Sequence, residues 1–242
     1  MAYSEHTSKQ YDVELESVRA RVLLMGELVE RQVRLAIEAL TRGDVALIDR
    51  IIANDHRVNA LEVGIDESCS HIIARRQPAA GDLRMVMMVI KTITDLEHIG
   101  DEAKKIAITA KRLSQEKSLS LPRFDKIKHV TNLALDMLLK SLHAFANLDI
   151  SAVIQVMRQD EHVDEEFRIV IRYFVTFMME DPRTISSALE ILFVAKAIER
   201  IGDHAKNMSK YVVYMVKGRD VRHIAVEEIE REVQQQFVVV SI

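Results

Sequence analysis

The 242-residue chain is poor in the residues that make cross-links and tight turns, with one cysteine, three prolines and seven glycines. The single cysteine, Cys69, excludes an internal disulfide and fits a reducing compartment. Because glycine and proline mark most tight turns, their scarcity favours long helices over a many-stranded sheet. Cys69 lies in an apolar stretch at residues 65–73, which predicts a core residue rather than a catalytic thiol.

An excess of charge of one sign is also missing, since 33 basic residues face 37 acidic ones and the net charge is -4. This balance argues against a broad electrostatic surface for nucleic acid. No segment approaches the ~18 apolar residues of a membrane span, and the first residues lack the basic and apolar regions of a signal peptide. We therefore expect a soluble, cytoplasmic protein that binds no nucleic acid.

The chain contains an internal repeat. Residues 97–104, EHIGDEAK, recur at 199–206 as ERIGDHAK, with six of the eight positions identical. The offset between the copies is 102 residues here and 105 upstream, because the turn at Pro78 is three residues longer than the turn at Pro182. Insertions belong in turns, so the change of offset supports the alignment and predicts two copies of one structural unit.

Apolar residues recur at three- and four-residue spacing through each copy, which predicts three long helices per copy. Short connections make such helices antiparallel neighbours. The expected fold class is therefore all-α, with two antiparallel three-helix bundles in tandem. The expected parts are an N-terminal tail (1–11), a first repeat (12–114), a second repeat (121–218) and a C-terminal tail (219–242).

Residues with capping or breaking preferences stand at the expected helix ends. In the first copy, Gly43 ends a helix, Asp44 caps the next one and Asp82 caps the third. In the second copy, Asp149 caps the second helix and Pro182 opens the third, while Pro122 lies near the start.

Carboxylates are duplicated with the repeat. Glu97 and Asp101 are four residues apart and share one helix face, as do Glu199 and Asp203. Counting back through each turn brings acidic residues of the preceding helix to the same height. The candidate metal ligands are Asp55, Glu62, Glu97 and Asp101 in the first copy, with Asn59 beside them, and Asp160, Asp164, Glu199 and Asp203 in the second.

Converging oxygen ligands suit hard cations such as Mg²⁺, Mn²⁺, Ca²⁺ or oxidised iron. The alternative interpretation is a salt-bridge network with Lys104 and Lys206, each about one turn beyond its acidic pair. The residues alone leave both interpretations open.

Several strings resemble the PhoU family: RRQPAAGDLR at 75–84, MGELVE at 25–30 and the two E-x-I-G-D motifs, within a similarity that runs from Tyr11 to about His223. The resemblance implies two three-helix bundles, a tendency to form homodimers, and metal ions or clusters (Mg, Mn, Fe or Zn) on the acidic motifs. Glu97, Asp101, Glu199 and Asp203 match those motifs.

The resemblance also implies a function without catalysis. It implies a negative regulator of the phosphate-starvation response, placed between the phosphate ABC transporter, through its ATPase subunit, and the sensor kinase PhoR. One departure from symmetry is visible in the chain. Asn59 stands where the second copy has Asp164, and Glu62 stands where it has Phe167, so the two metal sites are expected to differ.

Three rival functions are weaker. A di-metal enzyme of the ferritin-like kind uses a Glu-x-x-His pair, and none occurs in the chain. A metal-dependent phosphohydrolase wants a mixed His and Asp centre, for which the histidines are not placed; His98, for example, has Arg200 as its counterpart and is predicted to be a surface residue. A purely structural role as a helical spacer stays open as an alternative.

The apolar end of the tail, residues 237–240, is expected to dock on the bundle or on a second subunit.

Overall fold

The structure, a computed structural model, describes residues 9–115 and 124–231, and in these ranges it contains helices and no strand. The first repeat consists of α1 (Lys9–Arg42), α2 (Val45–Asn54), α3 (His56–Arg76) and α4 (Ala80–Gln115). The second consists of α5 (Asp125–Asn147), α6 (Ile150–Glu180), the short 3₁₀ helix η1 (Pro182–Thr184) and α7 (Ile185–Lys217). The all-α fold class and the repeat are confirmed. Pro122 and residues 237–240 lie outside the described ranges.

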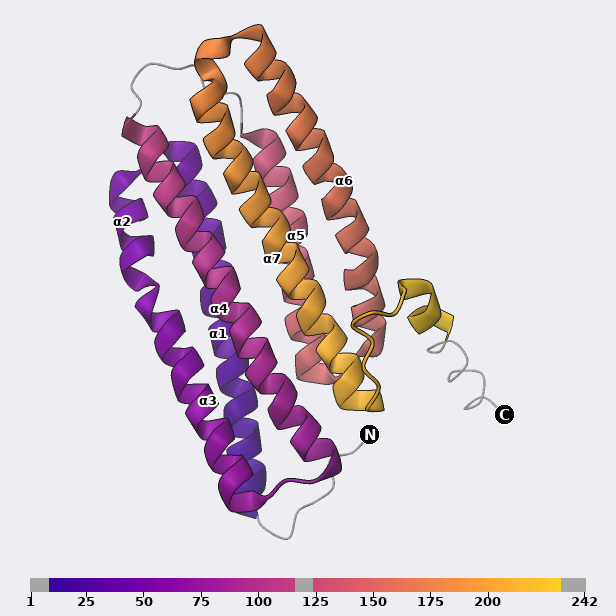
Figure 1. Ribbon diagram of the computed structural model, residues 1–242. Helices are drawn as coiled ribbons and strands as arrows, with labels where there is room; N and C mark the ends of the chain where they lie inside the picture. Colours follow the sequence, from indigo (N-terminus) through magenta and orange to yellow (C-terminus); the bar gives the residue numbers. More distant parts are fainter. Residues whose placement is uncertain (1–8, 116–123, 232–242) are drawn as a thin grey trace.

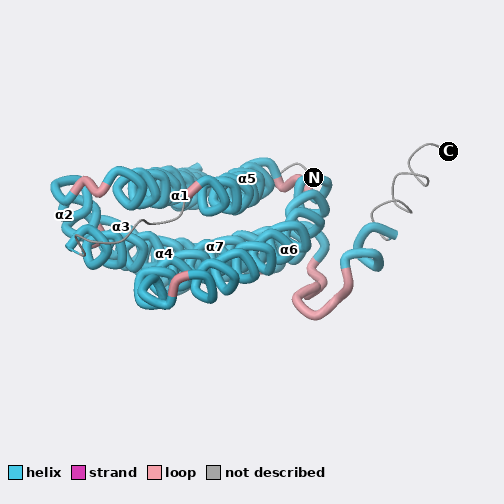
Figure 2. Tube along the Cα trace, turned by 90° about the horizontal axis from the view of Figure 1, so that it is seen from above, coloured by secondary structure: helices cyan, strands magenta, loops and turns pink. Residues whose placement is uncertain are grey.

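The two bundles lie side by side, with their helices roughly parallel to one long axis (Figure 1). Between the repeats, α4 packs against α7 and α1 packs against α5. Seen along the helices, α1 and α5 form one layer and α3, α4, α7 and α6 form a second, curved layer (Figure 2). The buried apolar side chains of both repeats join in one continuous core. The molecule is therefore two repeats sharing one core rather than two separate bundles.

Local chemistry sets most helix ends as expected. Gly43, at φ 65°, ends α1, and the Asp44 carboxylate accepts a hydrogen bond from the Leu47 backbone N–H at 3.0 Å. In the second repeat, the Asp149 carboxylate accepts from the Ser151 N–H at 2.8 Å. These N-caps satisfy donors that the first helical turn leaves unpaired.

The prediction for Asp82 was wrong. The helix already begins at Ala80, whose φ of 44° turns the chain, and Asp82 lies inside the first turn rather than at the cap. There its carboxylate accepts a hydrogen bond from the Tyr11 hydroxyl at 3.3 Å. A negative charge in the first turn still suits the helix dipole, so Asp82 supports the same helix from a different position.

The expected second helix of the first repeat is divided at Asp55 into α2 and α3. Asp55 keeps right-handed helical angles, with φ -56° and ψ -37°, but its carbonyl accepts from the Val58 N–H at 3.0 Å in a tighter turn. The equivalent helix of the second repeat, α6, runs unbroken. The first repeat is thus irregular at one of its candidate ligands.

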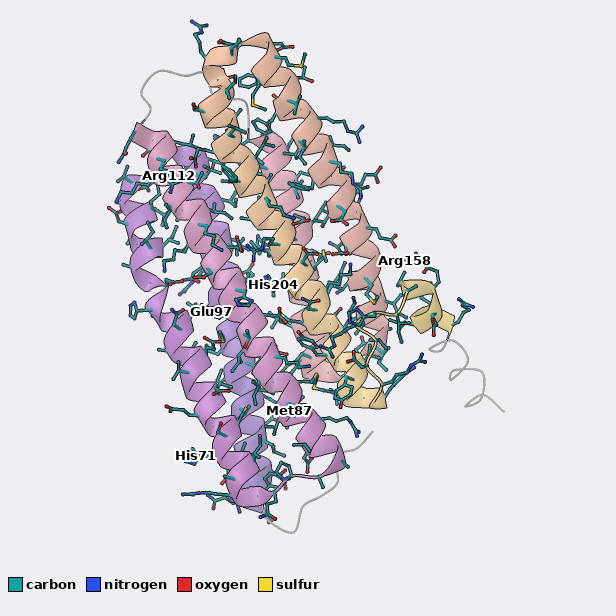
Figure 3. All side chains as sticks on the ribbon, in the orientation of Figure 1. His71, Met87, Glu97, Arg112, Arg158 and His204 are labelled. Carbon is teal, nitrogen blue, oxygen red and sulfur yellow. The ribbon has the colours of Figure 1, made fainter. Side chains whose placement is uncertain are left out.

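Beyond α7, the described part of the C-terminal segment lies against α6. A short helix at 226–231 presents two carboxylates to Arg158, whose guanidinium reaches Glu230 at 2.8 Å and Glu227 at 3.1 Å. Arg158 lies on α6 beside this segment in Figure 3. The described part of the segment therefore contacts the bundle, and the docking expected of residues 237–240 stays a prediction. No helix among them is long and apolar enough to cross a membrane.

Candidate functional site

The first acidic cluster lies between α3 and α4, where Figure 3 shows Glu97. Asp55 is 3% exposed, and its Oδ2 accepts a hydrogen bond from Lys104 Nζ at 2.7 Å. Its second oxygen, Oδ1, is buried and has no hydrogen-bond partner among the described residues. An unpaired buried carboxylate oxygen is unfavourable, so this atom fits a ligand position for a cation.

The other members of the first cluster are close enough to affect one another electrostatically. Burial raises the pKa of Glu97, and the charges of Asp101 and then Asp55 raise it further. Burial also raises the pKa of Glu62, with the charge of Glu97 adding to the effect. The structure therefore brings together Asp55, Glu62, Glu97 and Asp101, as the count along the antiparallel helices predicted. Asn59 is exposed.

The second acidic cluster lies between α6 and α7. Asp160 is 4% exposed, and its Oδ2 forms a short ion pair with Lys206. Burial raises the pKa of Asp203, and the charges of Glu199, Asp160 and Asp164 raise it further. All four predicted carboxylates thus lie near one another in this repeat too.

The glycine of each motif allows close packing of the helices. A Cβ on Gly100 would lie 3.3 Å from Val58 Cγ1, and a Cβ on Gly202 would lie 3.6 Å from Val163 Cγ1. Val58 belongs to α3 and Val163 to α6, the helices that carry the opposing acids. The glycines therefore draw the two acid-bearing helices of each repeat together.

The structure contains features of both interpretations of the acidic residues, the salt-bridge network and the metal site. The first cluster pairs Asp55 with Lys104, and the second pairs Asp160 with Lys206 and Glu199 with Lys196 at 2.6 Å, so an ion-pair network exists in each. Among the described residues, neither cluster brings three ligand atoms within 4.8 Å of one another. Metal binding at these eight residues stays a prediction, and it requires the side chains to close around the ion.

A third polar group lies between the repeats, where α4 crosses α7, and the sequence did not predict it. The Glu102 carboxylate is 2% exposed and forms an ion pair with the Arg200 guanidinium at 2.7 Å. Next to this pair, the His98 and His204 rings lie 5.1 Å apart, and His204 Nδ1 lies 2.7 Å from Asp95 Oδ1. His98 is exposed as predicted, but the expectation that the histidines are not placed for a mixed His and Asp centre was wrong, because Asp95, His98 and His204 converge here.

One signal in the sequence marks this interface. The two copies of the eight-residue motif differ at two positions: His98 against Arg200, and Glu102 against His204. These four residues form two of the contacts across the interface, Glu102 with Arg200 and His204 with His98. Positions that differ in an otherwise identical repeat therefore point to the surface where the copies meet.

The fold and the clusters define a class: an all-helical protein of two similar three-helix units, each carrying an acidic cluster built around one buried aspartate, Asp55 or Asp160. The PhoU domain matches twice, at residues 22–110 and 127–212. The phosphate-specific transport system accessory protein PhoU of Escherichia coli K12 is 44% identical over 94% of this chain and 94% of its own. A PhoU homolog from a Burkholderia species is 46% identical, over 94% of this chain and 97% of its own.

Solved structures agree with the sequences. The crystal structure of PhoU from Pseudomonas aeruginosa is 42% identical, with a TM-score of 0.82 over 86% of this chain and all of that one. The phosphate transport system regulatory protein PhoU from Streptococcus pneumoniae is 27% identical, with a TM-score of 0.80 over 87% of this chain and 99% of that one. The chain belongs to the PhoU family, as the resemblance of its motifs indicated.

Proposed function

We propose that this protein is an accessory regulator of phosphate uptake that carries out no catalysis of its own. The observation that supports the proposal most directly is its 44% identity, over nearly the full length of both chains, to an accessory protein of a phosphate-specific transport system. In this role it contacts the phosphate ABC transporter, through the ATPase subunit, and the sensor kinase PhoR. It represses the phosphate-starvation response when phosphate is plentiful.

Deletion of the protein tests this function. A reporter under a phosphate-responsive promoter is expected to become active in high phosphate, because the repressing signal to the kinase is lost. Expression of the wild-type chain should silence the reporter again. A reporter that stays silent in the deletion strain contradicts the proposal.

The absence of turnover needs its own measurement. Purified protein is expected to show no multiple-turnover hydrolysis of a phosphate ester with Mg²⁺ or Mn²⁺ present. Multiple-turnover hydrolysis by the wild-type protein that is lost in the double variant Glu97→Ala, Asp101→Ala would show that the protein is an enzyme and contradict the proposal.

We further propose that the acidic clusters bind hard cations. A bound cation supplies the positive charge that neutralises each cluster. Lys104 and Lys206 then release Asp55 and Asp160, so that the carboxylates can turn toward the ion. Burial and mutual repulsion make the charged, metal-free clusters unfavourable, so metal should stabilise the fold by linkage.

The two clusters should bind unequally. The second has two carboxylates on each of two facing helices, whereas in the first Asn59 replaces one acid and the ligands spread along α3. Affinity for hard cations follows ligand charge and rigidity, so the second should be tighter. In titrations of metal-stripped protein with Mn²⁺, Glu199→Ala with Asp203→Ala should remove the tighter phase, and Glu97→Ala with Asp101→Ala the weaker one. Unchanged binding and melting in both double variants would leave the clusters as ion-pair networks.

Homodimer formation completes the proposal. Three large apolar side chains, Ile185, Leu189 and Phe193, are exposed at four-residue spacing along α7. Such a stripe on a helix supports contact with another apolar surface. Sedimentation analysis of the purified chain should show a dimer, and a monomer at all concentrations contradicts this part.

A further inference from the structure

Three metal-ligating side chains meet between the repeats, outside both acidic clusters. Asp95 and His98 are one turn apart on α4, and His204 comes from α7, where Figure 3 shows it facing α4. One ligand atom from each of these three residues lies within 4.8 Å of the other two. The two acidic clusters do not reach this degree of convergence within the described residues.

The aspartate of this group is buried and incompletely paired. Asp95 is 6% exposed, and its Oδ1 lies 2.7 Å from His204 Nδ1. Its other oxygen, Oδ2, is buried and has no hydrogen-bond partner among the described residues. The Tyr211 hydroxyl interacts with the same carboxylate, since burial, the Asp95 charge and a hydrogen bond with Asp95 raise the pKa of Tyr211, while Oδ2 itself meets no partner with hydrogen-bond geometry in the described residues. The carboxylate therefore has an unused acceptor that points to a ligand.

We propose that Asp95, His98 and His204 bind one divalent cation of borderline softness, such as Zn²⁺. This ion would link the first repeat to the second. Two imidazoles and one carboxylate are a donor set that Zn²⁺ prefers, whereas the all-oxygen clusters suit harder ions. His98 is exposed, which gives the ion an entry path and leaves room for water as a fourth ligand. The proposal is independent of the acidic clusters and of the regulatory function.

The charges around the site allow a cation to enter. The nearby Arg200 guanidinium is already engaged by the buried Glu102 carboxylate at 2.7 Å. On the other side, the Glu97 carboxylate lies 3.9 Å from His98 Nε2 and adds negative charge. For Asp95 and His204 Nδ1 to bind a cation together, the hydrogen bond between Oδ1 and Nδ1 would open, and the proton held in it would leave to solvent.

A second histidine group must be removed before the test. His129 of α5 and His162 and Glu166 of α6 also place ligand atoms within 4.8 Å of one another, but none of the three is buried and none leaves an unpaired buried atom. The parent protein for the experiment therefore carries His129→Gln and His162→Gln. Any remaining imidazole-dependent binding then comes from elsewhere in the chain.

The experiment is a titration of metal-stripped, full-length parent protein with Co²⁺, whose visible absorption reports nitrogen ligands, followed by displacement with Zn²⁺. One Co²⁺ per chain with the absorption of nitrogen ligands is expected, apart from any Co²⁺ held by the all-oxygen clusters. His98→Gln, His204→Gln and Asp95→Asn should each weaken it at least about tenfold. His71→Gln, an exposed histidine far along α3 (Figure 3), is the matched control and should stay within twofold.

Two results would overturn the proposal. One is Co²⁺ binding of unchanged affinity and spectrum in both His98→Gln and His204→Gln. The other is binding that survives in those variants and disappears in Glu199→Gln with Asp203→Asn, which would assign the ion to an acidic cluster. Because His98 is exposed, its replacement leaves the core intact, so His98→Gln decides the question even where His204→Gln folds poorly.

Discussion

Three glycines inside helices have different amounts of space around them. A Cβ on Gly26 of α1 would lie 2.5 Å from Leu142 Cδ2 of α5, a distance that real side chains do not adopt. On Gly100 the nearest atom would be Val58 Cγ1 at 3.3 Å, and on Gly202 a methionine sulfur at 3.5 Å. Only the distance at Gly202 is an ordinary van der Waals contact. Replacing glycine by alanine should therefore change the stability in opposite directions at Gly202 and Gly26.

Alanine substitutions should follow this order. Gly202→Ala should raise the free energy of unfolding by about 0.5–1 kcal/mol, because alanine is the better helix former and fits the space. Gly26→Ala should lower it by about 1–2 kcal/mol, because overpacking outweighs the gain in helix propensity. Gly100→Ala should lie between them. Chemical denaturation of the three variants measures the order, and a Gly26→Ala variant more stable than wild type contradicts the packing argument.

Cys69 should be chemically inert while the protein is folded. Its side chain is fully buried, and burial raises the pKa of the thiol to about 12. The thiolate that reacts with disulfide reagents is then about a thousandfold scarcer than at the ordinary pKa of 9.0, besides being inaccessible. At pH 8 a disulfide reagent should label Cys69 in guanidinium chloride and leave the native protein unmodified. Stoichiometric labelling of native protein within minutes would show that α3 opens easily.

At the scale of the element, the sequence predicted the helix ends that depend only on neighbouring residues. The ends at Gly43, Asp44 and Asp149 follow from backbone angles and caps that involve only neighbouring residues. The division at Asp55 could not be predicted in this way. Apolar periodicity continues through Asp55, and Asp55 and Asp160 both pair with a distant lysine, yet only the helix at Asp55 is divided.

The C-terminal segment is held to α6 by ion pairs that all involve one residue, Arg158. Arg158 bonds Glu230 through two nitrogens and Glu227 through one. Arg158→Gln should therefore loosen the short helix at 226–231 and leave the bundle intact. Hydrogen exchange measured by mass spectrometry should become faster in residues 219–231 and stay unchanged in α4. Arg172→Gln, an exposed arginine further along α6, is the control. Equal protection of the segment in Arg158→Gln and wild type would mean that its apolar contacts suffice.

At the scale of the whole molecule, the candidate sites were predicted unevenly. The repeat and the antiparallel helices placed the eight acids of the two clusters, because height along a helix follows from counting residues. The contact of α4 with α7 was not predicted, because it is made in part by polar residues such as Glu102 and Arg200. A pattern of apolar periodicity identifies a buried face only where apolar residues line it.

The shared core predicts how the protein unfolds. Since α4 packs on α7, α1 packs on α5 and the buried side chains form one cluster, neither repeat can unfold without exposing the other's apolar surface. Calorimetry should show one transition, with calorimetric and van't Hoff enthalpies in agreement. Glu102→Ala should lower the temperature of that single transition rather than split it. Two resolved transitions, in wild type or in the variant, would mean that the repeats are independent domains.

The antiparallel pairing of α4 with α7 follows the contact rule of a symmetric dimer. Glu102 meets Arg200, and the residues at the exchanged positions, His204 and His98, meet in turn. In a homodimer of single repeats, every substitution at this interface would appear on both sides of the axis. In one polypeptide each side can be changed alone, and this chain holds an ion pair on one side and a pair of histidines on the other.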